Sequence, residues 1–258
     1  MKKRSICRLS IVILASLLLA GCQGSAKKQL SEEDQLKRIK IHYQIGLDAL
    51  HKNQLPKAFE ELMKAEALDS HHVDTLAALG YAWRKRGNFK KSEKYYKRAI
   101  QSGADSSIYT NYGSLLLEMQ RYADAKVQID KALEDPRYRN QFVAYILLGD
   151  AVLGLGRFDD AIAAYRQAGA MNPGQRNYSR IKEAEACISF KRYNYAKALY
   201  ETILRENSSD RVAVEGLVKL LKLRNDRAGA RKHLKSFIQN TKSELDRAWA
   251  SDELERVR

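Results

Sequence analysis

Residues 142–175 read FVAYILLGDAVLGLGRFDDAIAAYRQAGAMNPGQ, and this stretch decides the fold. Large apolar residues recur at helical spacing in both halves, and Gly156-Arg157 between the halves is typical of a turn. The small residues Gly149 and Ala161 lie where the two helices would cross, and only small side chains let helix axes approach within ~8–10 Å. The stretch therefore predicts a helix–turn–helix unit.

The same pattern returns along the whole chain. An alanine or serine is followed by a large residue four positions later at Ala58, Ser92, Ala125, Ala161, Ala196 and Ala230. By subtraction the intervals are 34, 33, 36, 35 and 34 residues, a period typical of stacked helix pairs rather than of an enzyme core. Each unit buries its apolar face only against its neighbours, so one continuous array is expected.

This spacing resembles the tetratricopeptide repeat, whose 34-residue consensus carries Leu-Gly, Ala, an aromatic residue and Ala at fixed positions. The repeat at 142–175 matches best, with Leu148-Gly149, Ala161, Tyr165, Ala168 and Pro173. Repeats five and six replace the glycine by Ala184 and Val218. We expect an all-α fold: a right-handed tetratricopeptide-repeat solenoid of six helix pairs over residues 36–242, closed by a C-terminal capping helix over residues 243–258.

Two regions depart from the repeat. Between repeats three and four the interval lengthens to 36 residues around Pro136, which prevents the preceding helix from continuing; a bend or a binding loop is expected there. At the C-terminus Ser243 and Asp246 form a capping-box pattern. The face of the final helix that we expect to cover the stack carries Leu245, Ala248 and Trp249.

The first 21 residues form a separate segment. Four basic residues precede an apolar stretch at 9–20, which is too short for a membrane span of about 20 residues and is typical of an export signal. Leu19-Ala20-Gly21-Cys22 then resembles the lipobox of bacterial lipoproteins. We expect residues 1–21 to be a lipoprotein signal peptide, Cys22 to carry the lipid, and residues 22–35 to form a lipidated tether.

The lipobox also implies a location. Acyl chains contribute ~0.8 kcal/mol per buried CH₂, and two or more chains hold a protein stably in a membrane. Resemblance to sorted lipoproteins, with Gln23 instead of Asp after Cys22, implies the periplasmic face of the outer membrane. The alternative is an ordinary secretory signal that happens to precede a cysteine.

The mature chain is basic. Without the four basic residues of the signal, 46 − 4 = 42 Lys and Arg remain against 31 Asp and Glu, an excess that favours anionic lipid head groups, phosphorylated glycolipid or acidic proteins. The charge concentrates between Arg84 and Arg98, among aromatic residues. Such a pattern occurs in nucleic-acid-binding proteins, but the export signal argues against a nucleic-acid partner, and the aromatic residues have core spacing. A solvated basic face is the simpler interpretation.

Patterns of catalysis are absent from the sequence. We find no phosphate-cradling glycine loop, hydrolase elbow or zinc-spaced cysteine set. The adjacent His71 and His72 cannot point at one metal. Cys187, the cysteine that remains beside Cys22 after signal removal, has no evident His or Asp partner and is expected to be a small buried hydrophobe. We therefore expect no enzyme, cofactor, metal or small-molecule substrate.

A partner is expected on the first helices of the repeats, which line the concave face of tetratricopeptide stacks. Positions 5 and 9, which project into that face in such stacks, are Tyr43 and Leu47, Ala77 and Tyr81, Thr110 and Ser114, Ile146 and Asp150, Ile181 and Glu185, and Glu215 and Lys219. Tyr43, Leu47 and Tyr81 indicate an apolar, aromatic groove suited to a helix or an extended segment. The alternative is that they pack between repeats.

Three polar residues complete the candidate set. Asn111, one turn before Ser114, is either a hydrogen-bond partner for a bound peptide backbone or a local cap. Arg84 belongs to the basic face of repeat two, which is the next candidate surface.

Finally, the segments 110–116 (TNYGSLL) and 120–125 (QRYADA) and the lengthened junction near 135–138 resemble the type IV pilus pilotin lipoproteins. With the lipobox, the six repeats and the terminal helix, the resemblance covers nearly all of the mature chain. It implies a lipid-anchored chaperone that binds secretin subunits and promotes their outer-membrane localisation and multimerisation. The alternative is a general periplasmic scaffold lipoprotein that recruits cell-wall hydrolases or proteases.

Overall fold

The computed structural model describes residues 31–103 and 105–257, so the expected signal peptide and Cys22 lie outside the described residues. Over the described residues the chain forms thirteen α-helices, one short 3-10 helix and no strand. The helices are α2 (Glu32–His51), α3 (Leu55–Leu68), α4 (Val73–Lys85), α5 (Phe89–Gln101), α6 (Ser106–Glu118), α7 (Tyr122–Leu133), α8 (Gln141–Gly154), α9 (Phe158–Met171), η1 (Pro173–Gln175), α10 (Arg176–Ser189), α11 (Tyr193–Glu206), α12 (Arg211–Leu223), α13 (Arg227–Asn240) and α14 (Glu244–Arg256).

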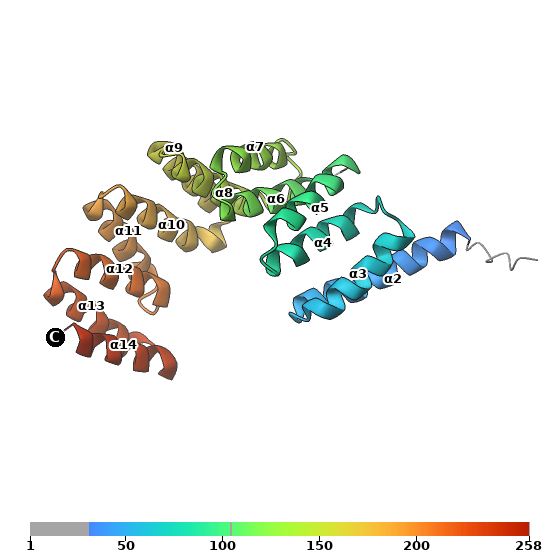
Figure 1. Cartoon of the computed structure of the whole chain (residues 1–258). Helices are drawn as coiled ribbons and strands as arrows, with labels where there is room; N and C mark the ends of the chain where they lie inside the picture. Colours follow the sequence, from blue (N-terminus) through green and yellow to red (C-terminus); the bar gives the residue numbers. More distant parts are fainter. Residues whose placement is uncertain (1–30, 104, 258) are drawn as a thin grey trace, which may run out of the picture.

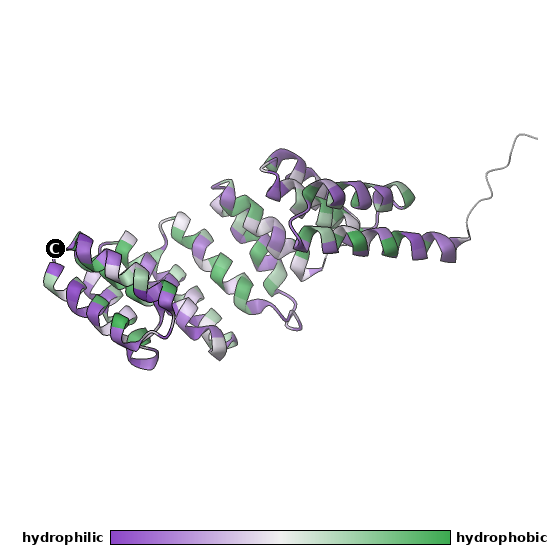
Figure 2. Cartoon of the chain, turned by 90° about the horizontal axis from the view of Figure 1, so that it is seen from below, coloured by the Kyte–Doolittle hydropathy of each residue, from purple (hydrophilic) through white to green (hydrophobic). Residues whose placement is uncertain are grey.

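The helices form six consecutive pairs, from α2 with α3 to α12 with α13, and α14 packs on α13. Figure 1 shows the pairs as an arch, with the first helices such as α4, α6 and α10 towards its inner side and second helices such as α7 and α9 on the outside. Hydrophobic residues gather where helices face one another, and hydrophilic residues cover the outer surfaces (Figure 2). The expected solenoid of six helix pairs with a closing helix is confirmed.

Every pair is joined by the same turn. One residue in each turn has φ between 57° and 78°: Asn53, Gly87, Gln120, Gly156, Lys191 and Asn225. The next backbone N–H donates to a carbonyl in the last turn of the first helix, as from Arg192 to Cys187 at 2.7 Å, which is the Schellman arrangement. Each of these residues lies five positions before the recurring Ala or Ser. The repeat period therefore has a local backbone cause.

The recurring glycines lie where the helices of a pair meet. Gly149 on α8 touches the ring of Tyr165 on α9, and a Cβ added there would lie 2.3 Å from ring atom Cε1. Tyr165 is fully buried, and its hydroxyl donates to Asp150 Oδ1 at 2.8 Å. Lys182 Nζ on α10 lies 2.8 Å from the same oxygen. The hydroxyl end of the ring is thus fixed by Asp150, and the ring edge lies where a side chain on residue 149 would be, which agrees with the small residue expected at the crossing.

The first helix begins earlier than expected. Residues 32–35 belong to α2 and not to the tether. Ser31 caps the helix, since its Oγ accepts from the backbone N–H of Asp34 at 3.1 Å. The acidic residues of the first turn stabilise the helix by interacting with the positive end of its dipole.

The buried face of α14 is also shifted, so the expectation for its covering residues is corrected. Leu245 is 85% exposed and Ala248 is exposed, whereas Ala250 is buried. Trp249 lies at the edge of the buried face and reaches the core with its ring, whose centroid is 6.1 Å from that of Phe237. Leu245 and Ala248 lie further round the helix and point to solvent. Ser243 does cap α14, accepting from the N–H of Asp246 at 3.2 Å.

The irregular junction confirms that the helix stops before Pro136. α7 ends at Leu133 and α8 begins at Gln141. Tyr138 is half-buried against the core of repeats two to four, and burial raises the pKa of its hydroxyl. This ring anchors the junction to the stack.

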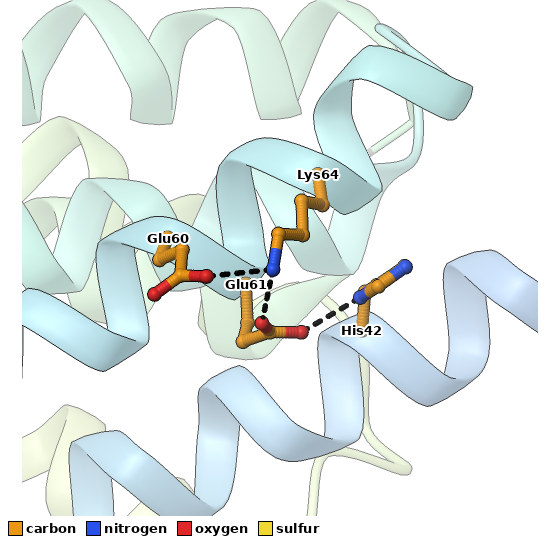
Figure 3. A network of polar contacts seen from close by, with 4 residues as sticks. All are labelled: His42, Glu60, Glu61 and Lys64. Atoms are coloured by element: carbon orange, nitrogen blue, oxygen red, sulfur yellow. Dashed lines mark hydrogen bonds and ion pairs between the residues drawn. The ribbon is translucent and has the colours of Figure 1, made fainter.

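Polar contacts supplement the core at the N-terminal pair. Glu61 on α3 is buried, and its carboxylate accepts from Lys64 Nζ at 2.7 Å and lies 2.7 Å from His42 Nδ1 on α2. Figure 3 shows that Lys64 also reaches Glu60. The hydrogen bonds from Lys64 and His42 lower the pKa of the Glu61 carboxyl. They satisfy a charge that burial would otherwise destabilise.

A half-buried carboxylate connects repeats two and three. Glu93 on α5 accepts from Tyr112 of α6 at 2.9 Å and from Arg121 at 2.8 Å, and pairs with Lys97 at 2.8 Å. Burial alone would raise the pKa of the Glu93 carboxyl, but these hydrogen bonds outweigh it and hold the pKa at about 2. Three donors from separate segments thus depend on one charged group.

Glu93→Gln is expected to lower the free energy of unfolding by about 2 kcal/mol at neutral pH, since hydrogen bonds to a charged group are lost. The folded-state pKa is below the ordinary 4.5, so this stabilisation is present above that value and is lost as pH falls. The difference between wild type and variant should shrink between about pH 5 and pH 2. Thermal unfolding at several pH values measures it. Glu60→Gln, at an exposed pair, is the control; an equal effect there would contradict the assignment.

Candidate partner-binding surfaces

The structure brings Tyr43, Leu47 and Tyr81 together at the junction of repeats one and two. All three are half-buried and pack against one apolar cluster that includes Leu50, Leu62 and Leu79. Their side chains thus contribute to contact between repeats as well as to the surface.

Tyr43 is held by its neighbours. Its ring meets the ring of His72 edge-on at 5.9 Å, and His72 is the N-cap of α4. The pKa of the Tyr43 hydroxyl is raised, mainly by burial and to a smaller extent by the negative charge of Asp74. Removing this ring would therefore disturb the start of α4.

Arg84 lies on α4, whereas four of the exposed lysines of repeat two lie on α5. Its Nε is 3.0 Å from Glu118 Oε1 on α6, and its side chain is 21% exposed. Its guanidinium carbon is 5.8 Å from the centroid of the Tyr81 ring. Arg84 therefore bridges two first helices, beside the aromatic cluster.

Asn111 and Ser114 lie on α6, well inside the helix. The cap of α6 is Asp105, so the interpretation of Asn111 as a local cap is wrong. Asn111 is exposed, and it has no hydrogen bond within residues 31–103 and 105–257. Its amide is available to a partner.

A hollow of about 370 Å³ opens between α10 and α12, the first helices of repeats five and six. Ile181, Tyr200 and Leu220 form its buried floor. Val212 and Leu223, at opposite ends of α12, are 56% and 59% exposed on its rim. Gly216 admits the Tyr200 ring, because a Cβ there would lie 2.5 Å from ring atom Cζ. The hollow is therefore apolar at both its floor and its ends.

Charged residues line the middle of this hollow. They are Glu185, Glu215 and Lys219. Glu215 is 2.8 Å from Lys219 and 3.4 Å from Arg211, and its pKa is lowered mainly by Lys219. Apolar ends with charges between them suit an amphipathic segment of another protein. This hollow is lined by Ile181, Glu185, Glu215 and Lys219, at sequence-predicted concave positions.

Val212 and Leu223 were not among the predicted site residues. They lie 11 residues apart, three helical turns, and so share a face of α12. Their positions as large apolar residues on the polar side of an amphipathic helix could have indicated this site from the sequence.

Other kinds of site are not apparent in the described part of the chain. No three His, Cys, Asp or Glu side chains between residues 31 and 257, residue 104 aside, are placed to hold a metal ion. No helix in the same part is long and apolar enough to cross a membrane. Cys187 is a buried free thiol, and burial raises its pKa to about 11, so it is a structural residue of α10.

Comparison with known proteins agrees with this architecture. Two family models, both described as tetratricopeptide repeat, match residues 73–103 and 112–176. Together with the six stacked helix pairs, these matches define the class of fold: the described part of the chain is a tetratricopeptide-repeat solenoid. Proteins of this fold generally act as scaffolds for other proteins.

Its relatives include proteins of pilus assembly. The chain is 22% identical over 223 residues to the type IV pilus assembly protein PilF of Pseudomonas aeruginosa, covering 85% of this chain and 88% of that one. The solved structure of P. aeruginosa PilF superposes with a TM-score of 0.66 at 20% identity, covering 85% and 99% of the two chains. The structure of PilW, described as a widely conserved type IV pilus biogenesis factor, superposes with a TM-score of 0.70 at 17% identity. The match covers 83% of this chain and 98% of the PilW chain.

Proposed function

We propose that this protein is an outer-membrane lipoprotein that binds secretin subunits and promotes their localisation and multimerisation in type IV pilus biogenesis. The observation that carries the proposal is the similarity to PilF over 85% of this chain and 88% of that protein. The lipobox at Leu19–Cys22 supports an anchor. Cys22 would locate the protein, and the helical stack would recognise the partner.

Recognition would use the hollow between α10 and α12. Val212 and Leu223 are exposed apolar residues at its two ends, and burying such side chains drives association. The N-terminal residues Tyr43, Leu47 and Tyr81 are already half-buried within the stack, so they have less surface to offer. A secretin segment with apolar side chains spaced along one helix face, or in an extended strand, would fit.

Val212→Asp combined with Leu223→Asp is expected to weaken secretin capture about thirty-fold or more, the loss typical of one truncated hot-spot contact of ~2 kcal/mol. Both residues are exposed, so the stability of the stack should change little. The measurement is a pull-down of purified secretin subunits, with secretin multimers assayed in cells. Val127→Asp with Leu245→Asp changes the same chemistry at exposed sites outside the hollow and should leave capture unchanged.

Tyr43→Ala with Tyr81→Ala tests the alternative surface. We expect this pair to lower the melting temperature, because both rings pack between repeats. If it instead melts like wild type and captures no secretin, the partner binds the N-terminal cluster and not the hollow. Capture of cell-wall hydrolases or proteases in place of secretin would favour the general scaffold.

A further inference from the structure

The outer surface of α5 is entirely basic apart from one amide. The exposed residues of this helix are Lys90, Lys91, Lys94, Lys97 and Gln101. A shallow hollow of about 610 Å³ follows the same face. On α9, the corresponding helix of repeat four, the exposed residues include Asp159 and Asp160 beside Arg166. The outer face of α9 is therefore mixed in charge, whereas the exposed residues of α13 at the far end of the array, like those of α5, include no acidic residue.

Neighbouring acids leave much of this charge uncompensated. Glu93, the acidic residue of α5, is shared among Lys97, Arg121 and Tyr112. Lys90 and Lys94 form no ion pair within the described ranges 31–103 and 105–257. Their ammonium groups are free to meet an anionic surface.

The C-terminal end of α5 lies at the same edge of the array as the start of α2, where the tether would enter. Gln35 Nε2, near the start of α2, donates to the carbonyl of Leu68 at 2.6 Å. Arg98 on α5 donates to the carbonyl of Ser70, two residues further along, at 3.0 Å. In Figure 1 the start of α2 and the end of α5 lie on the same side of the arch. From Cys22 to Ser31 there are 31 − 22 = 9 residues, which reach at most about 30 Å.

We propose that the lysine face of α5, formed by Lys90, Lys91, Lys94 and Lys97, docks on an anionic phospholipid surface. Protein interfaces centre on aromatic or aliphatic anchors and are depleted in lysine, and the exposed positions of α5 carry neither kind of anchor. Flexible ammonium groups instead suit attraction to lipid phosphates, which needs no fixed geometry.

Docking through α5 has a consequence for orientation. α5 is a second helix on the outer side of the arch, whereas α10 and α12, which form the hollow, are first helices. A stack that lies on the membrane through α5 therefore keeps the hollow clear of lipid. The identity of the membrane rests on the proposed function, but the binding step requires no lipid on Cys22.

The test is sedimentation of the full chain, carrying Cys22→Ala, with vesicles of phosphatidylcholine alone or of equal parts phosphatidylcholine and phosphatidylglycerol. Each lysine near an anionic membrane raises partitioning about five-fold. Lys90→Gln with Lys94→Gln should therefore reduce binding to the anionic vesicles about 25-fold, and phosphatidylcholine vesicles report what the rest of the chain contributes. The matched control is Lys232→Gln with Lys235→Gln, the same loss of charge from exposed positions of α13, at the opposite end of the array.

The proposal requires that the α5 pair lose anionic binding, that the α13 pair keep it, and that added salt release the wild type. Equal losses from both pairs would overturn it, since they would indicate a response to net charge alone. The proposal would also be overturned if the wild type bound anionic vesicles no more strongly than neutral ones. In that case an acidic protein would be the remaining candidate partner for the lysine face of α5. Secretin capture measured on the same preparations reports the proposed function separately.

Discussion

Gly149→Val is expected to destabilise the stack by about 3 kcal/mol, the upper part of the range typical of overpacked cores. A Cβ at Gly149 would lie within 2.8 Å of three atoms of the Tyr165 ring. The ring cannot swing aside, because Tyr165 is fully buried and its hydroxyl is bonded to Asp150. α8 and α9 would have to separate. Denaturant unfolding followed by circular dichroism measures the loss.

The control for this substitution is Gly174→Val, on the surface turn before α10. A Cβ there would approach only the side-chain oxygen of Asn172, at 3.4 Å, and φ is not in the left-handed region. A change of less than about 0.5 kcal/mol is expected, as is usual at surface sites. If Gly149→Val unfolds at the same denaturant concentration as wild type, the close approach of α8 and α9 is not needed for stability.

Cys22→Ala is expected to release the protein from the outer membrane without abolishing secretin capture. Acyl chains contribute ~0.8 kcal/mol per buried CH₂, so losing two or more chains removes nearly all of the anchoring free energy. The hollow between α10 and α12 lies far along the chain from Cys22, which separates location from recognition. Membrane fractionation with immunoblotting measures the first, and pull-down of secretin subunits the second.

Cys187→Ala provides the matched control. This thiol is buried on α10, so its removal should cost some stability and leave the protein in the membrane fraction. Should Cys22→Ala remain with the outer membrane, or should the mature N-terminus carry no lipid by mass spectrometry, the proposed anchor is wrong. Loss of secretin capture by soluble, folded Cys22→Ala would instead show that the lipid takes part in recognition.

The sequence alone was enough to predict the number of helix pairs, the turn at Gly156-Arg157 and the small residues at the crossing of α8 and α9. These features repeat with the chain because each depends on contacts within one unit or with the next. Gly149 and Ala161 are small because α8 and α9 cross there. Gly156 lies five positions before Ala161, and the turn residue of every other repeat has the same spacing from its recurring Ala or Ser. Local periodicity carries this information.

The tertiary structure decided which residues of the predicted faces meet solvent. Tyr43 and Tyr81 occupy concave positions by number, yet neighbouring helices half-bury them. Val212 and Leu223 line the hollow between α10 and α12 and remain more than half exposed. In α14, Ala250 and the ring of Trp249 face the core, whereas Leu245 points to solvent. Exposure depends on the angle and spacing of helices from adjacent repeats, and a pattern read along one helix does not contain them.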